Sequence, residues 1–237
     1  MEIPPGEVLR YLGYRNQTLD PAMTGLIEEC RAETETLIRP GVVYRIYALE
    51  KEGDAIRLPA TALSLQSRDL SKHLRAADRC VLLAATLGLA IDQKIAAYAR
   101  LDLTRAIVMD ACATAAIEAV CDEVQEQLQA KVTPEGYGLT ARFSPGYGDL
   151  SIVHQKTILE TLQAYARIGL TVTEDHILLP RKSVTAFIGL EKLEEKEMGP
   201  PVNEGGAKTA VNPDRCRCCP DQTCQYRKGG NGNATQA

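Results

Sequence analysis

Residues 92–131 restrict the fold more than any other segment, because nearly all of them favour a helix. Residues 104–129 contain neither Gly nor Pro, the two residues that most often interrupt a helix. The sequence therefore predicts one long helix. One stripe of it contains several small side chains, which would let another backbone or a ligand come close: Ile107, Ala111, Thr114, Glu118, Cys121 and Gln125.

Shorter elements are expected around this helix. Asp20 and Pro21 are typical of a helix start, because Asp caps free N–H groups and Pro fits the first turn. Residues 80–87 (CVLLAATL) are either a buried strand or the start of a helix. Helices and strands do not alternate regularly, which favours an α+β fold. Helices are expected at 5–13, 20–38, 67–78 and 149–166, and strands at 42–49, 55–58, 140–143 and 184–192.

The charge balance argues against some partners. The chain has 237 residues and a net charge of −4, so it has no general attraction to nucleic acid or anionic lipid. Its first residues, MEIPPGEVLR, lack the basic and apolar regions of a signal peptide. The longest apolar run, residues 80–91, is shorter than the roughly 20 residues that span a bilayer. We therefore expect a cytoplasmic protein with neither a nucleic-acid nor a membrane partner.

The composition changes after about residue 197. Residues 198–213 are rich in Pro, Gly and small polar side chains, which have little surface to bury and are typical of a linker. A cysteine cluster and a Gly/Asn-rich end follow. The sequence therefore predicts one folded domain over residues 1–197, followed by a flexible linker and a Cys-rich tail over residues 198–237.

The cysteines fall into two groups. Those in the tail have chelate-like spacing, and four thiolates suit zinc or an iron–sulfur cluster: Cys216, Cys218, Cys219 and Cys224. An unliganded tail is the alternative, because the spacing fits no standard ferredoxin motif. The other cysteines are scattered in apolar or helical segments and are expected to be buried thiols: Cys30, Cys80, Cys112 and Cys121.

Residues 142–149 (RFSPGYGD) form the most informative short segment. Pro145 and Gly146 suit the centre of a type II turn, since Pro presets a negative φ and Gly accepts a positive one. The Arg142 guanidinium can hold a carboxylate with two hydrogen bonds. Tyr147 offers an apolar ring and a hydroxyl, and Asp149 is placed to cap the following helix. On these residues alone, a plain surface turn between a strand and a helix remains the alternative.

The pattern Arg-x-x-x-Gly-Tyr, with Pro before Gly, resembles the S-adenosylmethionine-binding motif in the activation domain of cobalamin-dependent methionine synthase. The segment AIEAVCDEVQEQL before the motif fits this resemblance, and EVLRYLGYRNQ is similar to small stand-alone versions of the domain. The similarity covers roughly residues 5–195. It implies an α+β fold in which a mixed or antiparallel twisted sheet packs with long helices.

The resemblance also implies which residues bind S-adenosylmethionine. Arg142 would hold the methionyl carboxylate, and the backbone of Ser144 and Gly146 would contact the adenosine part. Tyr147 would lie on the side that faces the corrin ring. Glu118 would be the acidic ligand on the long helix.

A second acidic ligand is expected near the N-terminus, where Asp20 is a weak candidate. The segment LGYRNQTLD departs there from the pattern of the full-length enzymes.

The implied function is to support the reductive remethylation of cob(II)alamin, as a methyltransferase component that positions its ligand and uses no catalytic side chain. The chain contains no Asp-x-His-x-x-Gly motif, so cobalamin is expected on a partner, the B12-binding core of a methionine synthase. A flavodoxin or ferredoxin would donate the electron. Two alternatives remain: a non-catalytic module that binds a corrinoid protein, and a redox protein that works through a metal held by the cysteine tail.

Overall fold

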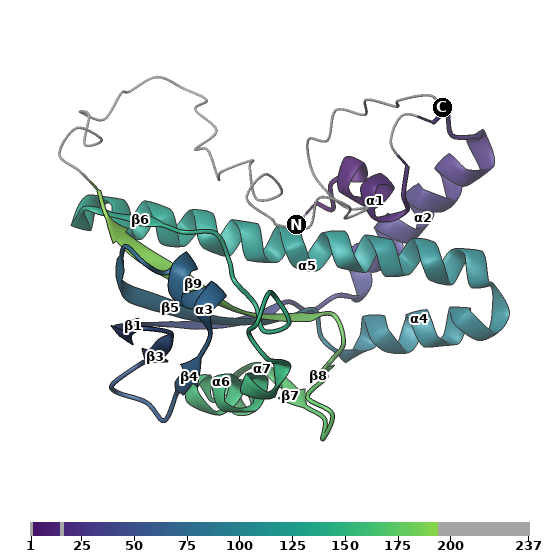
Figure 1. Cartoon of the computed structure of the whole chain (residues 1–237). Helices are drawn as coiled ribbons and strands as arrows, with labels where there is room; N and C mark the ends of the chain where they lie inside the picture. Colours follow the sequence, from purple (N-terminus) through teal and green to yellow (C-terminus); the bar gives the residue numbers. More distant parts are fainter. Residues whose placement is uncertain (1, 15–16, 194–237) are drawn as a thin grey trace, which may run out of the picture.

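The computed structural model describes residues 2–14 and 17–193. Its centre is a four-stranded antiparallel sheet in the order β1-β5-β9-β6 (Figure 1). The two middle strands are long and apolar, so most of the sheet is covered on both faces. The strands are β1 (Gly41–Ala48), β5 (Ala77–Thr86), β9 (Ser183–Lys192) and β6 (Tyr137–Leu139).

The long helix α5 (Leu103–Val132) covers one face of the sheet (Figure 1). Val81 and Leu83 of β5 pack toward its C-terminal half, beside Leu128. The alternate residues Cys80 and Leu82 belong to the core on the opposite face. A strand that is buried on both faces lacks the usual apolar–polar alternation, which explains why its sequence was ambiguous. The structure shows that this segment is a strand.

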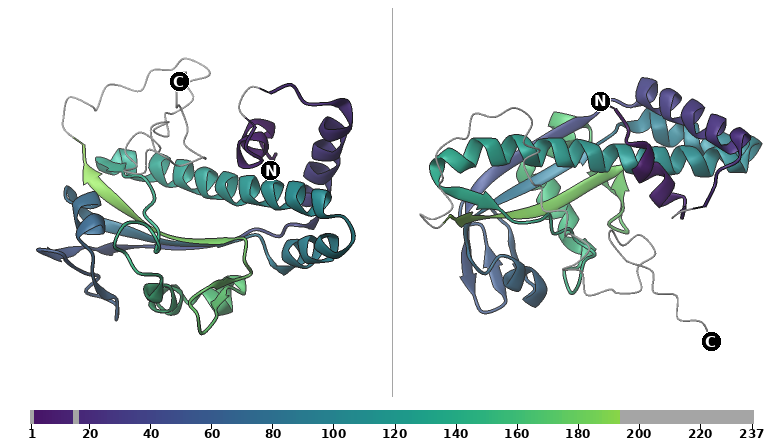
Figure 2. Two further views of the ribbon diagram at one scale, coloured as in Figure 1. Left: turned by 45° about the vertical axis from the view of Figure 1, so that its right-hand side comes forward. Right: turned by 90° about the horizontal axis from the view of Figure 1, so that it is seen from above.

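The other half of α5 packs against three helices, α1 (Pro5–Tyr11), α2 (Pro21–Leu37) and α4 (Leu89–Leu101). Seen from above, α1 and α2 lie over that end of α5 (Figure 2). The expected continuous helix 92–131 is therefore wrong in one respect, because it is two helices. The break is at Asp102, which has an extended backbone and accepts a hydrogen bond from the N–H of Arg105 at 3.0 Å.

The opposite face of the sheet is covered by short elements. Helices α6 (Gln155–Leu162) and α7 (Ala164–Ile168) lie beneath it in Figure 1, followed by the small pair β7 (Thr171–Val172) and β8 (Leu178–Leu179). The expected helix 149–166 is thus interrupted. Gln163 has a left-handed backbone, with a φ of 53°, and it ends α6 before α7 begins.

A small three-stranded sheet and several single turns complete the described chain. The small sheet contains a hairpin that turns at Gly53, as expected. The hairpin joins the short strands β2 (Glu50–Glu52) and β3 (Ala55–Arg57), whereas the expected strand 55–58 was to return along the strand 42–49. The other elements are β4 (Ser64–Gln66), α3 (Arg68–His73), η1 (Thr133–Glu135) and η2 (Ile152–His154). Among the described residues, no helix is both long and apolar enough to cross a membrane. The expected α+β class is confirmed.

Candidate functional site

Arg142 lies against α5, where three side chains accept hydrogen bonds from its guanidinium. Its Nη2 donates to Glu118 Oε2 at 2.8 Å and to Asp122 Oδ1 at 2.7 Å. Its Nη1 donates to Gln125 Oε1 at 3.1 Å. The three acceptors are spaced by four and then three residues, so they follow one stripe of the helix. The structure thus brings the predicted residues Arg142 and Glu118 into direct contact.

A one-residue irregularity at the sheet edge turns Arg142 toward α5. Leu139 of β6 pairs with Leu190 of β9, whereas the isolated bridge beyond it pairs Phe143 with Phe187. Between these two pairs, the segment that carries Arg142 advances by four residues whereas β9 advances by three, as in a β-bulge. Neighbouring side chains of a strand point to opposite faces, so one extra residue moves Arg142 to the α5 face of the sheet.

Gln125 connects the same helix to the backbone just ahead of Arg142. While its Oε1 accepts from Arg142, its Nε2 donates to the carbonyl of Thr140 at 3.1 Å. Thr140 is held in turn by Gly189 of β9, since their backbones pair and the Gly189 N–H donates to the Thr140 hydroxyl. Gln125 is only 7% exposed, so protein groups rather than bulk water must bond its amide. Hydrogen bonds therefore run from β9 to the guanidinium.

The guanidinium is buried, with 5% of the Arg142 side chain exposed, while the two carboxylates are about one-third exposed. Burial alone would lower the pKa of Arg142, but the neighbouring Cys121, Glu118 and Asp122 outweigh it and raise that pKa. Arg142 therefore keeps its positive charge. Two carboxylates against one guanidinium leave an excess of one negative charge among these three side chains.

The expected type II turn directly follows this cluster. The N–H of Tyr147 donates to the carbonyl of Ser144 at 3.0 Å, and Gly146 has a φ of 95°. The N–H of Gly146 also donates to the carbonyl of Leu150 at 2.7 Å, which closes the loop. Residues 146–149 are exposed, so the turn presents its backbone at the surface.

The Tyr147 ring packs in a row of aromatic rings. Its ring meets that of Phe143 edge-on at 5.9 Å, and the ring of Phe143 lies 5.2 Å from that of His73. The Nε2 of His73 is 2.8 Å from the carbonyl of Ala141. Burial lowers the pKa of His73, so at neutral pH the ring is uncharged and donates its Nε2–H to that carbonyl. Tyr147 itself is 56% exposed.

Asp149 is a cap, but not of the helix that was expected. Its carboxylate accepts hydrogen bonds from the Ser67 hydroxyl and from the N–H of Arg68 at 3.0 Å, at the start of α3. The next helical turn in the chain is capped instead by Ser151. The prediction is wrong because the fold brings this carboxylate to the start of α3, about eighty residues earlier in the sequence, rather than to the helix that follows it.

The C-terminal end of α1 brings Tyr11 near Glu118. Burial raises the pKa of Tyr11, and the Glu118 carboxylate raises it further, which places the phenol within electrostatic reach of the stripe on α5. The guanidinium carbon of Arg10 lies 4.1 Å from the centre of the Tyr11 ring. Arg10 also forms an ion pair with Glu7 at 2.6 Å. Asp20, the candidate acidic ligand, is exposed and caps α2 through the N–H of Met23 at 2.7 Å.

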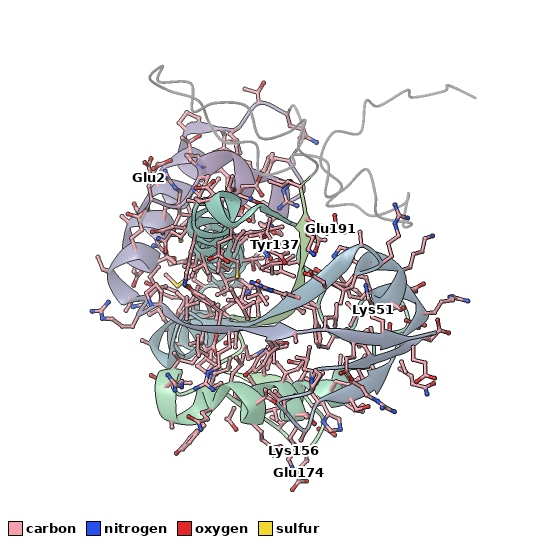
Figure 3. All side chains as sticks on the ribbon, turned by 90° about the vertical axis from the view of Figure 1, so that its left-hand side faces the viewer. Glu2, Lys51, Tyr137, Lys156, Glu174 and Glu191 are labelled. Atoms are coloured by element: carbon pink, nitrogen blue, oxygen red, sulfur yellow. The ribbon has the colours of Figure 1, made fainter. Side chains whose placement is uncertain are left out.

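A separate groove of about 550 Å³ lies on the other side of the sheet, between α6, α7 and the β7–β8 hairpin. Figure 3 shows two of its lining residues, Lys156 and Glu174, beneath the sheet and Tyr137 above it. None of the residues predicted to bind the ligand lines this groove. The Arg142 cluster holds charges and hydrogen-bond donors in a fixed arrangement, whereas the groove is an open surface depression.

The predicted metal ligands, Cys216, Cys218, Cys219 and Cys224, lie outside the described residues, so that site stays a prediction. The boundary at 197/198 also lies there. Within residues 2–14 and 17–193, no group of three or more His, Cys, Asp or Glu side chains is placed to hold a metal. The four scattered cysteines are buried free thiols, as expected: Cys30, Cys80, Cys112 and Cys121.

The structure places three further residues beside Arg142 and Glu118 that the sequence did not single out as ligands: Asp122, Gln125 and Tyr11. Helical spacing from Glu118 would have found the first two, since they follow it by one and two turns. No local pattern points to Tyr11, because α1 reaches Glu118 only through tertiary packing. The expected strand 140–143 is wrong in part, because regular pairing ends at Leu139 and resumes only at Phe143.

Comparisons with known proteins agree with the architecture. No family model matches the chain, and no curated protein matches it. Among solved structures, it is similar to the crystal structure of the MetH reactivation domain bound to AdoHcy, with a TM-score of 0.57. The two sequences are 17% identical over 80% of this chain and 77% of that one. The similarity in structure, at a low identity, shows that this chain has the fold of the MetH reactivation domain.

Proposed function

We propose that this protein binds S-adenosylmethionine at the Arg142 cluster and presents its methyl group to a cobalamin carried by a partner. The observation that carries the proposal is the direct contact between Arg142 and Glu118, the two residues that the family resemblance implies for the carboxylate and for the positive charge of the ligand. The solved protein with this fold is bound to AdoHcy, which S-adenosylmethionine becomes on losing its methyl group.

The donors and charges of the site fit such a ligand. The guanidinium of Arg142 has five N–H groups, and its three hydrogen bonds to α5 leave two, the Nε–H and one on Nη1, each able to donate to a carboxylate. The ammonium and sulfonium of S-adenosylmethionine are positive, and the excess negative charge of the cluster attracts them. The exposed turn at Gly146 offers backbone groups to the adenosine, and the Tyr147 ring lies beside that turn.

The role of the protein in this proposal is positioning. When bound, S-adenosylmethionine supplies an electrophilic methyl group to the reduced cobalt of a partner's cobalamin. The residues of this chain hold the amino-acid end at Arg142 and Glu118 and leave the Tyr147 side open to the partner. The partner would be the B12-binding core of a cobalamin-dependent methionine synthase, with a flavodoxin or ferredoxin as electron donor.

Calorimetric titration with S-adenosylmethionine and AdoHcy tests ligand binding. We expect saturable binding by the natural chain and at least about a tenfold loss in Arg142→Met, because a hydrogen bond to a charged group contributes roughly 1.5–3 kcal/mol. Arg105→Met is the matched control. Arg105 lies on the same helix, pairs with Glu29 at 2.7 Å, and is about 20 Å along the helix from Glu118.

Equal binding by Arg142→Met and Arg105→Met would contradict the assignment of the site. Absence of binding by the natural chain would instead favour the non-catalytic module. A partner loaded with cob(II)alamin, a reductant and S-adenosylmethionine then test the reaction. Appearance of the methylcobalamin spectrum only when this chain is present is the expected result.

A further inference from the structure

We propose that Asp122 and Gln125 are positioning residues that hold the Arg142 guanidinium in one orientation before the ligand arrives. The inference rests on the proposed function, because it describes how the same site is prepared for the ligand's α-carboxylate. Neither residue belongs to the Arg-x-x-x-Gly-Tyr motif, and both are identified by their contacts in the structure.

The geometry of the two contacts fixes the plane of the guanidinium. Asp122 accepts from Nη2 at 2.7 Å, and Gln125 accepts from Nη1 at 3.1 Å, so both terminal nitrogens of Arg142 are held from successive turns of one helix. An unrestrained arginine would lose much side-chain freedom when it met a ligand. A guanidinium that is already held loses less, which favours binding.

Gln125 suits this position better than a carboxylate would. Its amide is both acceptor and donor, so it bonds Arg142 through Oε1 and the carbonyl of Thr140 through Nε2. A glutamate there could not donate to that carbonyl. Because Thr140 is fixed to β9, Gln125 joins the position of the guanidinium to the central sheet.

Asp122 has a different task from Glu118, although both contact the same nitrogen. In the proposed function, Glu118 turns to the ammonium of the ligand and away from Arg142. A buried guanidinium that loses its only carboxylate is unfavourable, because its charge is then poorly compensated. Asp122 keeps a carboxylate on Arg142 whether or not Glu118 is engaged by the ligand.

The test compares S-adenosylmethionine with its decarboxylated form, which lacks only the carboxylate that Arg142 would bind. The quantity to measure, by calorimetry on the full chain, is the ratio of the two dissociation constants, decarboxylated over intact. We expect the natural chain to prefer the intact ligand. In Gln125→Met, which keeps the volume and removes both hydrogen bonds, the ratio should fall by about tenfold.

Asp122→Leu, which removes the acceptor oxygens of Asp122 as well as its charge, separates positioning from simple charge. Loss of a negative charge alone would weaken the decarboxylated ligand more, because that ligand carries the larger positive charge, and the ratio would rise. Loss of positioning acts on the carboxylate, and the ratio falls. Glu126→Gln, at an exposed position on the same helix, makes the same change in net charge without removing a contact to Arg142, so its ratio should not fall.

Other results would overturn either the positioning role or the proposed function. A Gln125→Met protein with the natural ratio, or one that loses both ligands equally, would overturn the positioning role. A natural chain that binds both ligands alike would overturn it as well, since Arg142 would then not recognise the carboxylate. A natural chain that binds neither ligand would reject the proposed function itself.

Discussion

At the scale of single residues, the site depends on close packing around Thr140. Gly189 lies in the middle of β9, where an added Cβ would stand 2.9 Å from Ala77 Cβ and 2.9 Å from Leu74 Cδ2. The same Cβ would stand 3.1 Å from Thr140 Cγ2. A methyl group at this position would therefore push on the residue that anchors Gln125.

We predict that Gly189→Ala lowers the free energy of unfolding by about 1–3 kcal/mol, as overpacking of a core does, and weakens ligand binding. Gly25→Ala is the control, because Gly25 is exposed on α2 with no atom within 4 Å of an added Cβ. That change should raise the free energy of unfolding by about 0.5–1 kcal/mol. Urea titration of both variants checks the pair, and a Gly189→Ala protein as stable as the natural chain would refute the packing argument.

At the scale of elements, Asp149 shows how a loop and a distant helix support one another. Its carboxylate accepts hydrogen bonds from the Ser67 hydroxyl and from two N–H groups at the start of α3, across 80 to 82 residues of sequence. These hydrogen bonds, with that from Ser67 first, hold the pKa of Asp149 below its ordinary value of 3.8. The loop that carries Gly146 and Tyr147 is therefore anchored at its far end by a charge.

We predict that Asp149→Asn lowers the melting temperature at pH 7. A carboxyl group whose pKa is depressed by folding stabilises the fold above its unfolded pKa and loses that contribution as the pH falls through the folded value. The difference in melting temperature between the variant and the natural chain should therefore shrink as the pH falls below 3.8. Thermal unfolding from pH 7 to pH 3 measures it. A difference that stays constant over this range would argue against the charged cap.

At the scale of the whole molecule, the Arg142 cluster lies in the described residues, whereas the cysteine motif belongs to the tail that the sequence predicts over residues 198–237. The cluster at Arg142 is built from α5, the sheet edge and β9, all within residues 103–192. The redox alternative assigns the activity to residues 198–237 instead. Removal of the tail therefore distinguishes the proposed function at the Arg142 cluster from the redox alternative.

We predict that a chain shortened to residues 1–197 binds S-adenosylmethionine with the affinity of the full chain. Zinc or iron, measured in protein purified without air, should be present in the full chain and absent from the short one. Four thiolates at the spacing of the tail have the chemistry for either metal. If the short chain retains ligand binding but loses all reactivation activity, the function depends on the tail and the redox reading is favoured.

Local patterns predicted much of this protein, because they depend on neighbouring residues. The N-cap at Asp20, the turn at Pro145 and Gly146, and the last strand are present as expected. The motif singled out Arg142, and the family resemblance added Glu118, which the fold places in contact with it. These features follow from capping, turn geometry and side-chain chemistry, which act over a few residues.

Tertiary structure decided what local patterns could not. A single extra residue in the edge pairing turns Arg142 to the α5 face, and only the register with β9 reveals it. The cap formed by Asp149 and the approach of Tyr11 to Glu118 join segments that are distant in the chain. Sequence by itself determined the chemical groups and their local conformations. Packing against one shared sheet and one long helix determined which groups meet, because contacts between distant segments exist only once the core has formed.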